Sequence, residues 1–207
     1  SGAVVDPSAL NSLLPDWQSD PDHPFKTPVV TDEFYYMNEK GALRLPNRLM
    51  PKLLGNHGNY IVSLGNVCRW LAQKAEALGV EIYPGFAANE VLYGEHNQVI
   101  GVATGDMGIG KDGSPKDGYT RGMELLGKYT LFSEGARGHL SKELIARYRL
   151  SHDREPQKFG IGIKELWQVR PEVHKPGHVQ HSFGWPLDNE TGLSLIHISE
   201  PTRPERI

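Results

Sequence analysis

The chain has 207 residues, of which 38% are hydrophobic and 23% are charged, a composition typical of a globular protein with a buried core. A formal net charge of -3 offers no dominant basic surface, so we expect no nucleic-acid partner. The single cysteine, Cys68, excludes an internal disulfide framework and an iron–sulfur cluster held by cysteines of this chain alone.

The first predicted element is a short helix near the N-terminus. Asp6 followed by Pro7 is typical of a helix start, because the acid caps free amides and proline suits the first turn. Two interpretations are open: a helix packed on a core, and a helix lying in a membrane interface, where tryptophan is favoured. Its apolar face consists of Ala9, Leu10, Leu13, Leu14 and Trp17.

A β-hairpin and a long helix follow. Residues 34–37 and 42–45 are apolar runs that flank a turn at 38–41. A glycine-rich turn at 55–60 then leads into a helix that ends at Gly79, a typical C-terminal cap. The predicted core face of this helix consists of Leu64, Val67, Cys68, Leu71, Ala75 and Leu78.

Short strands dominate the middle of the chain. Residues 80–83, a segment within 86–93 and residues 99–104 are predicted strands. Residues 105–122 are rich in turn formers and charges, which predicts a solvated loop. A helix followed by a strand and a hairpin indicates an α/β arrangement with an antiparallel excursion.

The stretch 129–144 is the strongest candidate for cofactor binding. Residues 129–132 are a predicted short buried strand, residues 133–138 a glycine turn, and a helix begins near Leu140. This order suits a phosphate-bearing cofactor, because unpaired amides and the helix dipole face the anion. An ordinary connection between a strand and a helix is the open alternative.

The C-terminal part has a different pattern. Residues 160–169 and 178–185 are predicted strands of an antiparallel sheet in a second lobe. The three nearby histidines do not predict a metal site, because residues 178 and 181 of one strand point to opposite faces. These histidines are His174, His178 and His181.

The last fifteen residues, 193–207, resemble the translation of an adapter used in preparing sequencing libraries. We therefore expect them to be read-through, and we expect the natural protein to continue past Gly192. The chain opens without a methionine and contains no run long enough to span a bilayer. Both ends lead us to expect an internal fragment of a longer protein.

Four motifs, at residues 55–62, 134–140, 160–167 and 184–188, together resemble the electron transfer flavoprotein–ubiquinone oxidoreductase family. The resemblance covers residues 1–192. It implies a peripheral membrane flavoprotein that passes electrons from reduced electron transfer flavoprotein, through FAD and a 4Fe-4S cluster, to ubiquinone. The cofactors carry such redox chemistry, so we nominate no catalytic side chain.

The resemblance also implies particular cofactor contacts. Glu134, Gly135, Ala136 and Arg137 lie where related flavoproteins close the FAD site, and backbone groups of Val91 lie where such proteins meet the adenine. Gly58 and Asn59 are weaker candidates on the flavin side. Residues 3–17 correspond to a membrane-associated segment, which favours the interfacial interpretation of the first helix. The implied location is the inner face of a bacterial plasma membrane or of the mitochondrial inner membrane.

The expected fold class is α/β (α+β), a partial FAD-binding, glutathione-reductase-like domain with an antiparallel-sheet, quinone-binding lobe. The expected division has four parts, ordered along the chain: a membrane-associated helix and loop, part of the FAD-binding domain, part of the ubiquinone-binding domain, and the non-native tail. Their bounds are 1–28, 29–150, 151–192 and 193–207.

The departures from the family pattern lead us to expect that the isolated chain is inactive. The dinucleotide fingerprint, the glycine pair that meets the quinone and the cluster cysteines are all missing from the sequence. Two alternatives are a related FAD-dependent reductase of the geranylgeranyl reductase type and a non-catalytic fragment that only binds a membrane.

Overall fold

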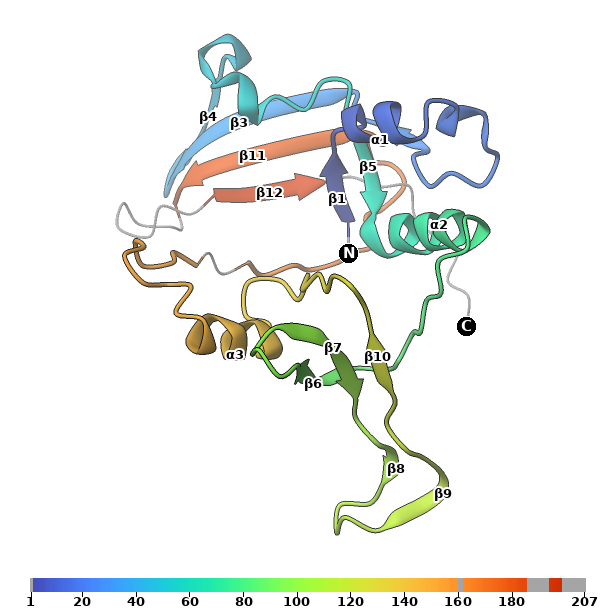
Figure 1. The fold of residues 1–207 in the computed structure, drawn as a ribbon. Helices are drawn as coiled ribbons and strands as arrows, with labels where there is room; N and C mark the ends of the chain where they lie inside the picture. The colour runs from blue at the N-terminus through green and yellow to red at the C-terminus, as the bar shows by residue number, and fades with distance from the viewer. Residues whose placement is uncertain (1, 160–161, 186–193, 199–207) are drawn as a thin grey trace. The chain divides into compact units, whose positions relative to one another are not determined.

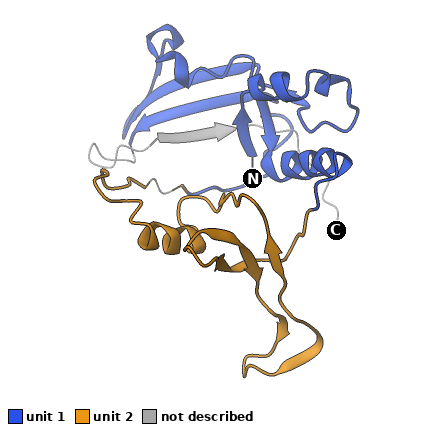
Figure 2. Cartoon of the chain, viewed as in Figure 1, with its two compact units in different colours: residues 1–81, 163–207 blue, residues 82–162 orange. Residues whose placement is uncertain are grey.

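The computed structural model describes residues 2–159, 162–185 and 194–198, with side chains up to residue 185 (Figure 1). The chain divides into two compact units, residues 1–81 with 163–207, and residues 82–162 (Figure 2). Both combine helices with sheets whose strand pairs are mostly antiparallel. The α+β part of the predicted fold class is therefore confirmed.

One sheet of the first unit has the order β1-β5-β2 and is antiparallel throughout. Its strands are β1 (Gly2–Val5), β5 (Tyr60–Ser63) and β2 (Thr27–Pro28). Strand β5 was not predicted, because the sequence analysis joined the glycine-rich turn directly to the long helix. That helix is α2 (Leu64–Ala77), which begins where β5 ends.

The second sheet of this unit has the order β12-β11-β3-β4. Strands β3 (Thr31–Asn38) and β4 (Gly41–Leu45) form the predicted hairpin. In its turn, Asn38 Oδ1 accepts hydrogen bonds from the backbone N–H groups of Lys40 and Gly41. Two 3-10 turns follow, η2 (Asn47–Leu49) and η3 (Lys52–Leu54).

The predicted strand at 178–185 is confirmed as β11 (His178–Gly184), but its predicted partner is wrong. Residues 162–169 form no strand, and residues 160–161 and 186–188 of the motifs lie outside the described residues. Instead, β11 runs parallel to β3, because both strands bury apolar side chains on a shared face. On its other side β11 pairs antiparallel with β12 (Ser194–Ile198), within the stretch expected to be read-through.

The largest core cluster of the first unit gathers aromatic side chains. Trp17, from the 3-10 turn η1 (Trp17–Ser19), packs edge-on against Phe25 and Tyr60, with ring centroids 5.1 and 5.6 Å apart. The short helix α1 (Ser8–Leu13) adds Leu10 to this cluster, and Asp6 Oδ1 accepts from Ser8 N at 2.8 Å. Burying Trp17 stabilises the unit by roughly 2–3 kcal/mol.

Helix α2 buries only part of its predicted face, where Leu71 packs on the same core as Val67. Val67 and Trp70 are its buried residues, whereas Cys68, predicted to be a small core residue, is exposed and Leu78 is 85% exposed. Trp70 sets this orientation because it is the largest apolar side chain of the helix and its Nε1–H donates to Asp20 at 2.9 Å. The predicted C-terminal cap is confirmed: Gly79 has φ +88°.

The second unit is built on a sheet of order β10-β7-β6, also antiparallel. Its strands are β6 (Ala88–Tyr93), β7 (Val99–Thr104) and β10 (Glu124–Leu126). The predicted strands within 86–93 and at 99–104 are thus confirmed. Helix α3 (His139–Arg147) covers this sheet, with Leu140 and Leu144 buried against Val91.

Three predictions for the second unit are wrong. Residues 80–83 form no strand, and the expected loop at 105–122 contains the hairpin of β8 (Met107–Ile109) and β9 (Pro115–Thr120). Residues 129–132 are not a strand either, and Tyr129 and Leu131 are more than 90% exposed. Residues 129–132 are paired with none of the described strands, although Phe132 packs against the core of the second unit.

Candidate functional site

The turn before helix α3 is closed by its own carboxylate. Glu134 Oε2 accepts hydrogen bonds from the backbone N–H and the hydroxyl of Ser141, both at 2.7 Å, and Oε1 lies 3.3 Å from the N–H of Leu140. These are the free amides of the first helical turn, the groups that the sequence analysis assigned to a phosphate. Glu134 therefore satisfies the helix N-terminus from within the chain.

The environment of Glu134 favours its ionised form. The hydrogen bond from the Ser141 hydroxyl is the main reason that the pKa of the Glu134 carboxyl lies below its ordinary value; partial burial opposes the shift. The imidazole of His139 lies 3.2 Å from the same carboxylate and adds a smaller effect in the same direction. A negative charge at this place also complements the helix dipole.

A cavity lies beside this cap. Its volume is about 260 Å³, and three of the predicted cofactor residues, Gly135, Ala136 and Arg137, line it. Lys142 brings a second cation to the lining, and the Arg137 guanidinium carbon lies 5.6 Å from the centroid of the Phe159 ring. Gly135 has φ +78° and an open Cβ position, so a ligand can approach its backbone closely.

Val91 belongs to the same unit but not to the cavity lining. Its side chain is 2% exposed and packs on Leu140 and Leu144, while its backbone pairs with Val102 in the sheet. On the sheet's other side, β6 is an edge strand among the described strands. The side chain of Val91 thus holds helix α3 in place, and any contact with a cofactor falls to its backbone.

Gly58 and Asn59, the weaker candidates, belong to the first unit. Gly58 has φ +87°, a conformation that glycine adopts at low cost. Asn59 accepts a hydrogen bond from Val29 N at 2.9 Å and donates its own N–H to Asn56 O at 3.0 Å. The structure therefore places the seven predicted cofactor residues in two groups, one in each unit.

The predicted membrane-contact residues are divided between core and surface. Leu10 and Trp17 are buried in the core, which agrees with the packed-helix alternative for these two side chains. Leu14 is partly buried against the same core, whereas Ala9 and Leu13 are exposed. In the described part of the chain, no helix is both apolar and long enough to cross a bilayer.

A more exposed apolar surface lies on the β3–β4 hairpin and the two 3-10 turns after it. Leu49 is 67% and Leu53 94% exposed, and Arg48 and Lys52 stand next to them in sequence. Solvent-exposed apolar side chains flanked by cations are typical of membrane-surface contacts. We call this set the hairpin patch; it consists of Tyr36, Leu43, Leu49, Leu53 and Leu54.

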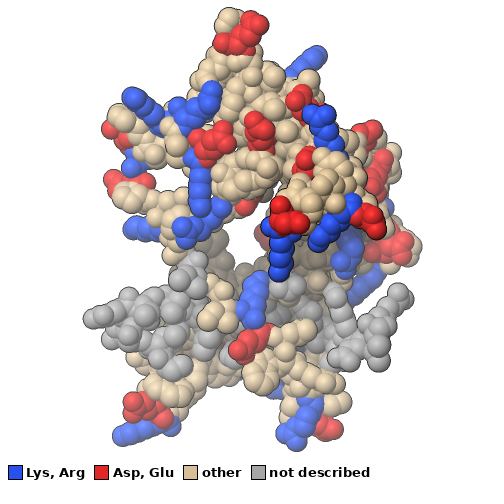
Figure 3. All heavy atoms as spheres, turned by 90° about the horizontal axis from the view of Figure 1, so that it is seen from below, with Lys and Arg blue, Asp and Glu red and all other residues tan. Residues whose placement is uncertain are grey.

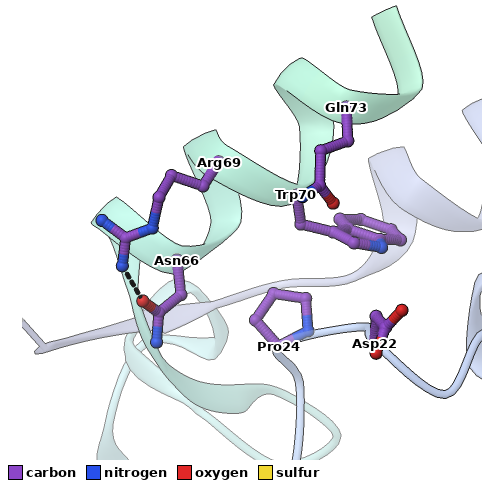
Figure 4. Close-up of a pocket in the computed structure, with 6 residues that line it drawn as sticks. All are labelled: Asp22, Pro24, Asn66, Arg69, Trp70 and Gln73. Atoms are coloured by element: carbon purple, nitrogen blue, oxygen red, sulfur yellow. Dashed lines mark hydrogen bonds between the residues drawn. The ribbon is translucent and has the colours of Figure 1, made fainter. Parts of the chain in front are cut away.

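A second, larger cavity in the first unit has a polar rim. It measures about 490 Å³ and lies between helix α2 and the loop that carries Asp22 and Pro24 (Figure 4). Arg69 donates to Asn66 along the helix, and Trp70 forms the floor with its indole tied to Asp20. No predicted cofactor residue lines this cavity.

Neither sign of charge dominates the face shown in Figure 3. Basic and acidic side chains are interspersed over the face shown in Figure 3. Within the described residues there is no group of three or more histidine, cysteine, aspartate or glutamate side chains arranged to hold a metal ion.

One polar cluster was missed entirely by the sequence analysis. Asp32, Asn56 and His181 meet in the interior of the first unit, although His181 follows Asn56 by 125 residues. The histidines were considered only as metal ligands, and strand alternation alone does not reveal a carboxylate on a neighbouring strand. The cluster depends on the parallel pairing of β3 with β11, which no local sequence pattern predicts.

Comparison with known proteins gives a consistent result. A family model described as "ETF-QO, ubiquinone-binding" matches residues 159–203. Its range extends past Gly192, and the expectation that 193–207 is read-through stays a prediction.

Full-length relatives match nearly the whole chain. The electron transfer flavoprotein-ubiquinone oxidoreductase of Pseudomonas aeruginosa is 54% identical over 203 residues, which are 97% of this chain and 37% of that protein. The mitochondrial proteins of Dictyostelium discoideum and Bos taurus are 52% and 50% identical over 97% of this chain and 32% of their own lengths. The chain spans about a third of the length of these relatives. Over nearly its whole length, the chain belongs to the electron transfer flavoprotein–ubiquinone oxidoreductase family.

Proposed function

We propose that this chain is the flavin-contacting and ubiquinone-contacting part of an oxidoreductase that passes electrons from reduced electron transfer flavoprotein to ubiquinone. The observation that carries the proposal is the identity of 54% over 97% of the chain to a protein of that name. The match of residues 159–203 to a ubiquinone-binding model supports ubiquinone as the acceptor.

The cavity beside Glu134 has a lining that suits the phosphate groups of a cofactor such as FAD. Arg137 and Lys142 supply positive charge, and the backbone at Gly135 leaves room for close approach. Because Glu134 keeps its carboxylate on the amides of helix α3, Arg137 and Lys142 would hold the cofactor's phosphates in place of the helix N-terminus. Bound FAD would supply the electron-carrying chemistry, and these residues would bind and orient it.

The residues present do not fit a 4Fe-4S cluster. Such a cluster is held by several cysteine thiolates, and this sequence has one cysteine, on the exposed side of helix α2. The ligands of such a cluster would therefore lie outside this chain.

We place the membrane contact on the hairpin patch instead of the N-terminal helix. The patch exposes five apolar side chains, whereas two of the five residues proposed from the sequence are buried in the core. A peripheral position at the inner face of a bacterial plasma membrane or mitochondrial inner membrane follows from this contact and from the kinship with mitochondrial and bacterial proteins.

Titration of FAD into the purified 207-residue chain tests the flavin assignment. We expect quenching of flavin fluorescence on binding, and we expect Arg137→Ala to raise Kd about tenfold, because one charge-assisted contact contributes roughly 1.5 kcal/mol. Arg121→Ala, a change of an exposed arginine in the same unit, serves as the matched control. Equal Kd values for Arg137→Ala and the unchanged chain would remove Arg137 from the site.

The two alternatives are less well supported. The relatives that match are named as ubiquinone oxidoreductases, which does not favour a reductase of the geranylgeranyl type. A fragment that only binds membrane would show liposome binding without any flavin binding, and the titration distinguishes this outcome.

A further inference from the structure

Three polar side chains from distant segments meet inside the first unit. Asp32 comes from β3, Asn56 from the loop between η3 and β5, and His181 from β11. The side chains of Asp32 and His181 are only 10% and 9% exposed. Polar groups this well buried are retained where their hydrogen bonds fix a structure or serve a site.

Asp32 holds both the backbone and the side chain of Asn56. Its Oδ2 accepts from Asn56 N at 2.9 Å, and its Oδ1 accepts from Asn56 Nδ2 at 3.1 Å. A carboxylate that receives two donors from one residue fixes that residue in position and orientation.

His181 completes the cluster from the other side. Its Nε2 lies 2.9 Å from Asn56 Nδ2 and 3.3 Å from Asp32 Oδ1. The ring stacks on Phe34, with centroids 4.5 Å apart and planes 7° from parallel, so its orientation is set by packing as well. Among the described residues, Asp32 supplies the carboxylate within 4.0 Å of this ring.

The amide group of Asn56 cannot donate to all of its neighbouring acceptor atoms at the same time. Asn56 Nδ2 has two hydrogens but three acceptor atoms within 3.2 Å: Leu54 O, Asp32 Oδ1 and His181 Nε2. The Nε2 of His181 either accepts from Asn56 or, in the tautomer that carries its hydrogen on Nε2, donates to Asp32. The ring nitrogen therefore takes a direct part in how Asn56 is held.

Asn56 in turn fixes the glycine-rich turn. Asn59 N donates to Asn56 O at 3.0 Å, and Val29 N donates to Asn59 O at 2.9 Å. Gly58, between them, adopts φ +87°. The backbone of the turn is thus tied to Asp32 at one end and to the core residue Val29 at the other.

We propose that Asp32 and His181 are positioning residues that act through Asn56 on Gly58 and Asn59. The cluster connects a strand within the segment matched as ubiquinone-binding to the turn assigned to the flavin side. The inference rests on the proposed function for the role of that turn, but the hydrogen bonds that hold the turn are independent of it.

The test compares two replacements of His181 in the full 207-residue chain. His181→Phe keeps an aromatic ring on Phe34 but removes both nitrogens, whereas His181→Gln retains a group that both donates and accepts. His178→Phe, on the same strand but beside Glu33, is the control. The readouts are amide hydrogen exchange of residues 55–60 without ligand and, separately, FAD affinity by fluorescence titration.

We expect His181→Phe to speed exchange at Asn56 and Asn59 at least tenfold and to raise the Kd for FAD about tenfold. His181→Gln and His178→Phe should stay within threefold of the unchanged chain in both measurements. Exchange in the turn that is unaffected by His181→Phe would overturn the proposal, as would a loss of FAD affinity that His181→Gln shares.

Two further outcomes are also decisive. If His181→Phe unfolds the unit, seen as fast exchange throughout β3 and β5, Asp32→Asn replaces it; an unchanged turn in that variant would overturn the proposal. If the unchanged chain binds no FAD while His181→Phe still loosens the turn, the positioning role stands and the proposed flavin function fails.

Discussion

Glu134 shows that the free amides of a helix N-terminus can donate to a side chain of the same chain. The sequence analysis assigned it to the cofactor because it stands in a glycine turn before a helix, and that pattern holds in the structure. Its side chain nevertheless turns toward the Leu140 and Ser141 amides of its own helix. A sequence pattern identifies such a turn but does not decide whether a ligand or a side chain satisfies its amides.

We predict that Glu134→Gln lowers the melting temperature of the second unit by roughly 5 °C near neutral pH, because a helix-capping charge is lost. The pKa of Glu134 is below the ordinary value of 4.5, so its stabilisation is fully present above that value and disappears as pH falls through the lower folded value. The difference between the two proteins should therefore shrink below about pH 4. Glu95→Gln, at an exposed turn of the same unit, is the control; a difference independent of pH would contradict the capping role.

At the scale of elements, local patterns located most strands and helices but failed where side-chain size or strand pairing decides. Asn38 and Gly41 predicted the β3–β4 hairpin, and Gly79 predicted the end of α2, since both depend on nearby residues alone. The buried face of α2 was predicted only in part, because Trp70 lies outside the predicted row of core residues. Its burial nevertheless contributes the most free energy, since it has the largest apolar side chain of the helix.

The β8–β9 hairpin was missed because β8 has only three residues and β9 is mostly polar and wholly exposed, so no extended alternation of apolar residues marks it. We predict that replacing residues 107–120 with a short Gly–Ser turn changes the melting temperature of the second unit by less than about 2 °C, since little apolar surface is lost. Differential scanning fluorimetry checks this. A drop of 5 °C or more would show that the hairpin supports the unit.

The hairpin patch and the N-terminal helix make different predictions for membranes. We expect Leu49→Asp with Leu53→Asp to reduce binding to anionic liposomes at least tenfold, because two exposed leucines each contribute about 1.5 kcal/mol when buried in lipid. Leu13→Asp with Leu14→Asp is the matched pair in the first helix. Vesicle sedimentation measures the binding of both double variants. If only the second pair weakens binding, the membrane contact lies on the N-terminal segment and not on the hairpin patch.

At the scale of the whole molecule, the sequence located the apolar segments but not their pairings. Residues 129–132 have the composition of a buried strand and yet lie exposed, and β11 joins β3 instead of its predicted neighbour. Pairings over such distances depend on which strand edges are free in the folded chain, and no local pattern encodes that.

We predict that limited trypsin digestion cleaves first at Lys158 and Lys164. These residues are exposed and lie outside helices and strands, so the protease can bind their backbone without local unfolding. Lys74, paired with Asp20 at 2.6 Å on helix α2, is the internal comparison. Intact-mass analysis of early fragments checks the order, and cleavage at Lys74 before these sites would contradict it.

The parallel contact between β3 and β11 also has a consequence for biosynthesis. Every residue of the second unit is translated after β3 and before β11, so the ribosome releases the hairpin long before the strand that completes its sheet. Until then, the β3 edge and Phe34 stand open to neighbouring nascent chains. Closure of this sheet therefore has to wait until β11 has left the ribosome.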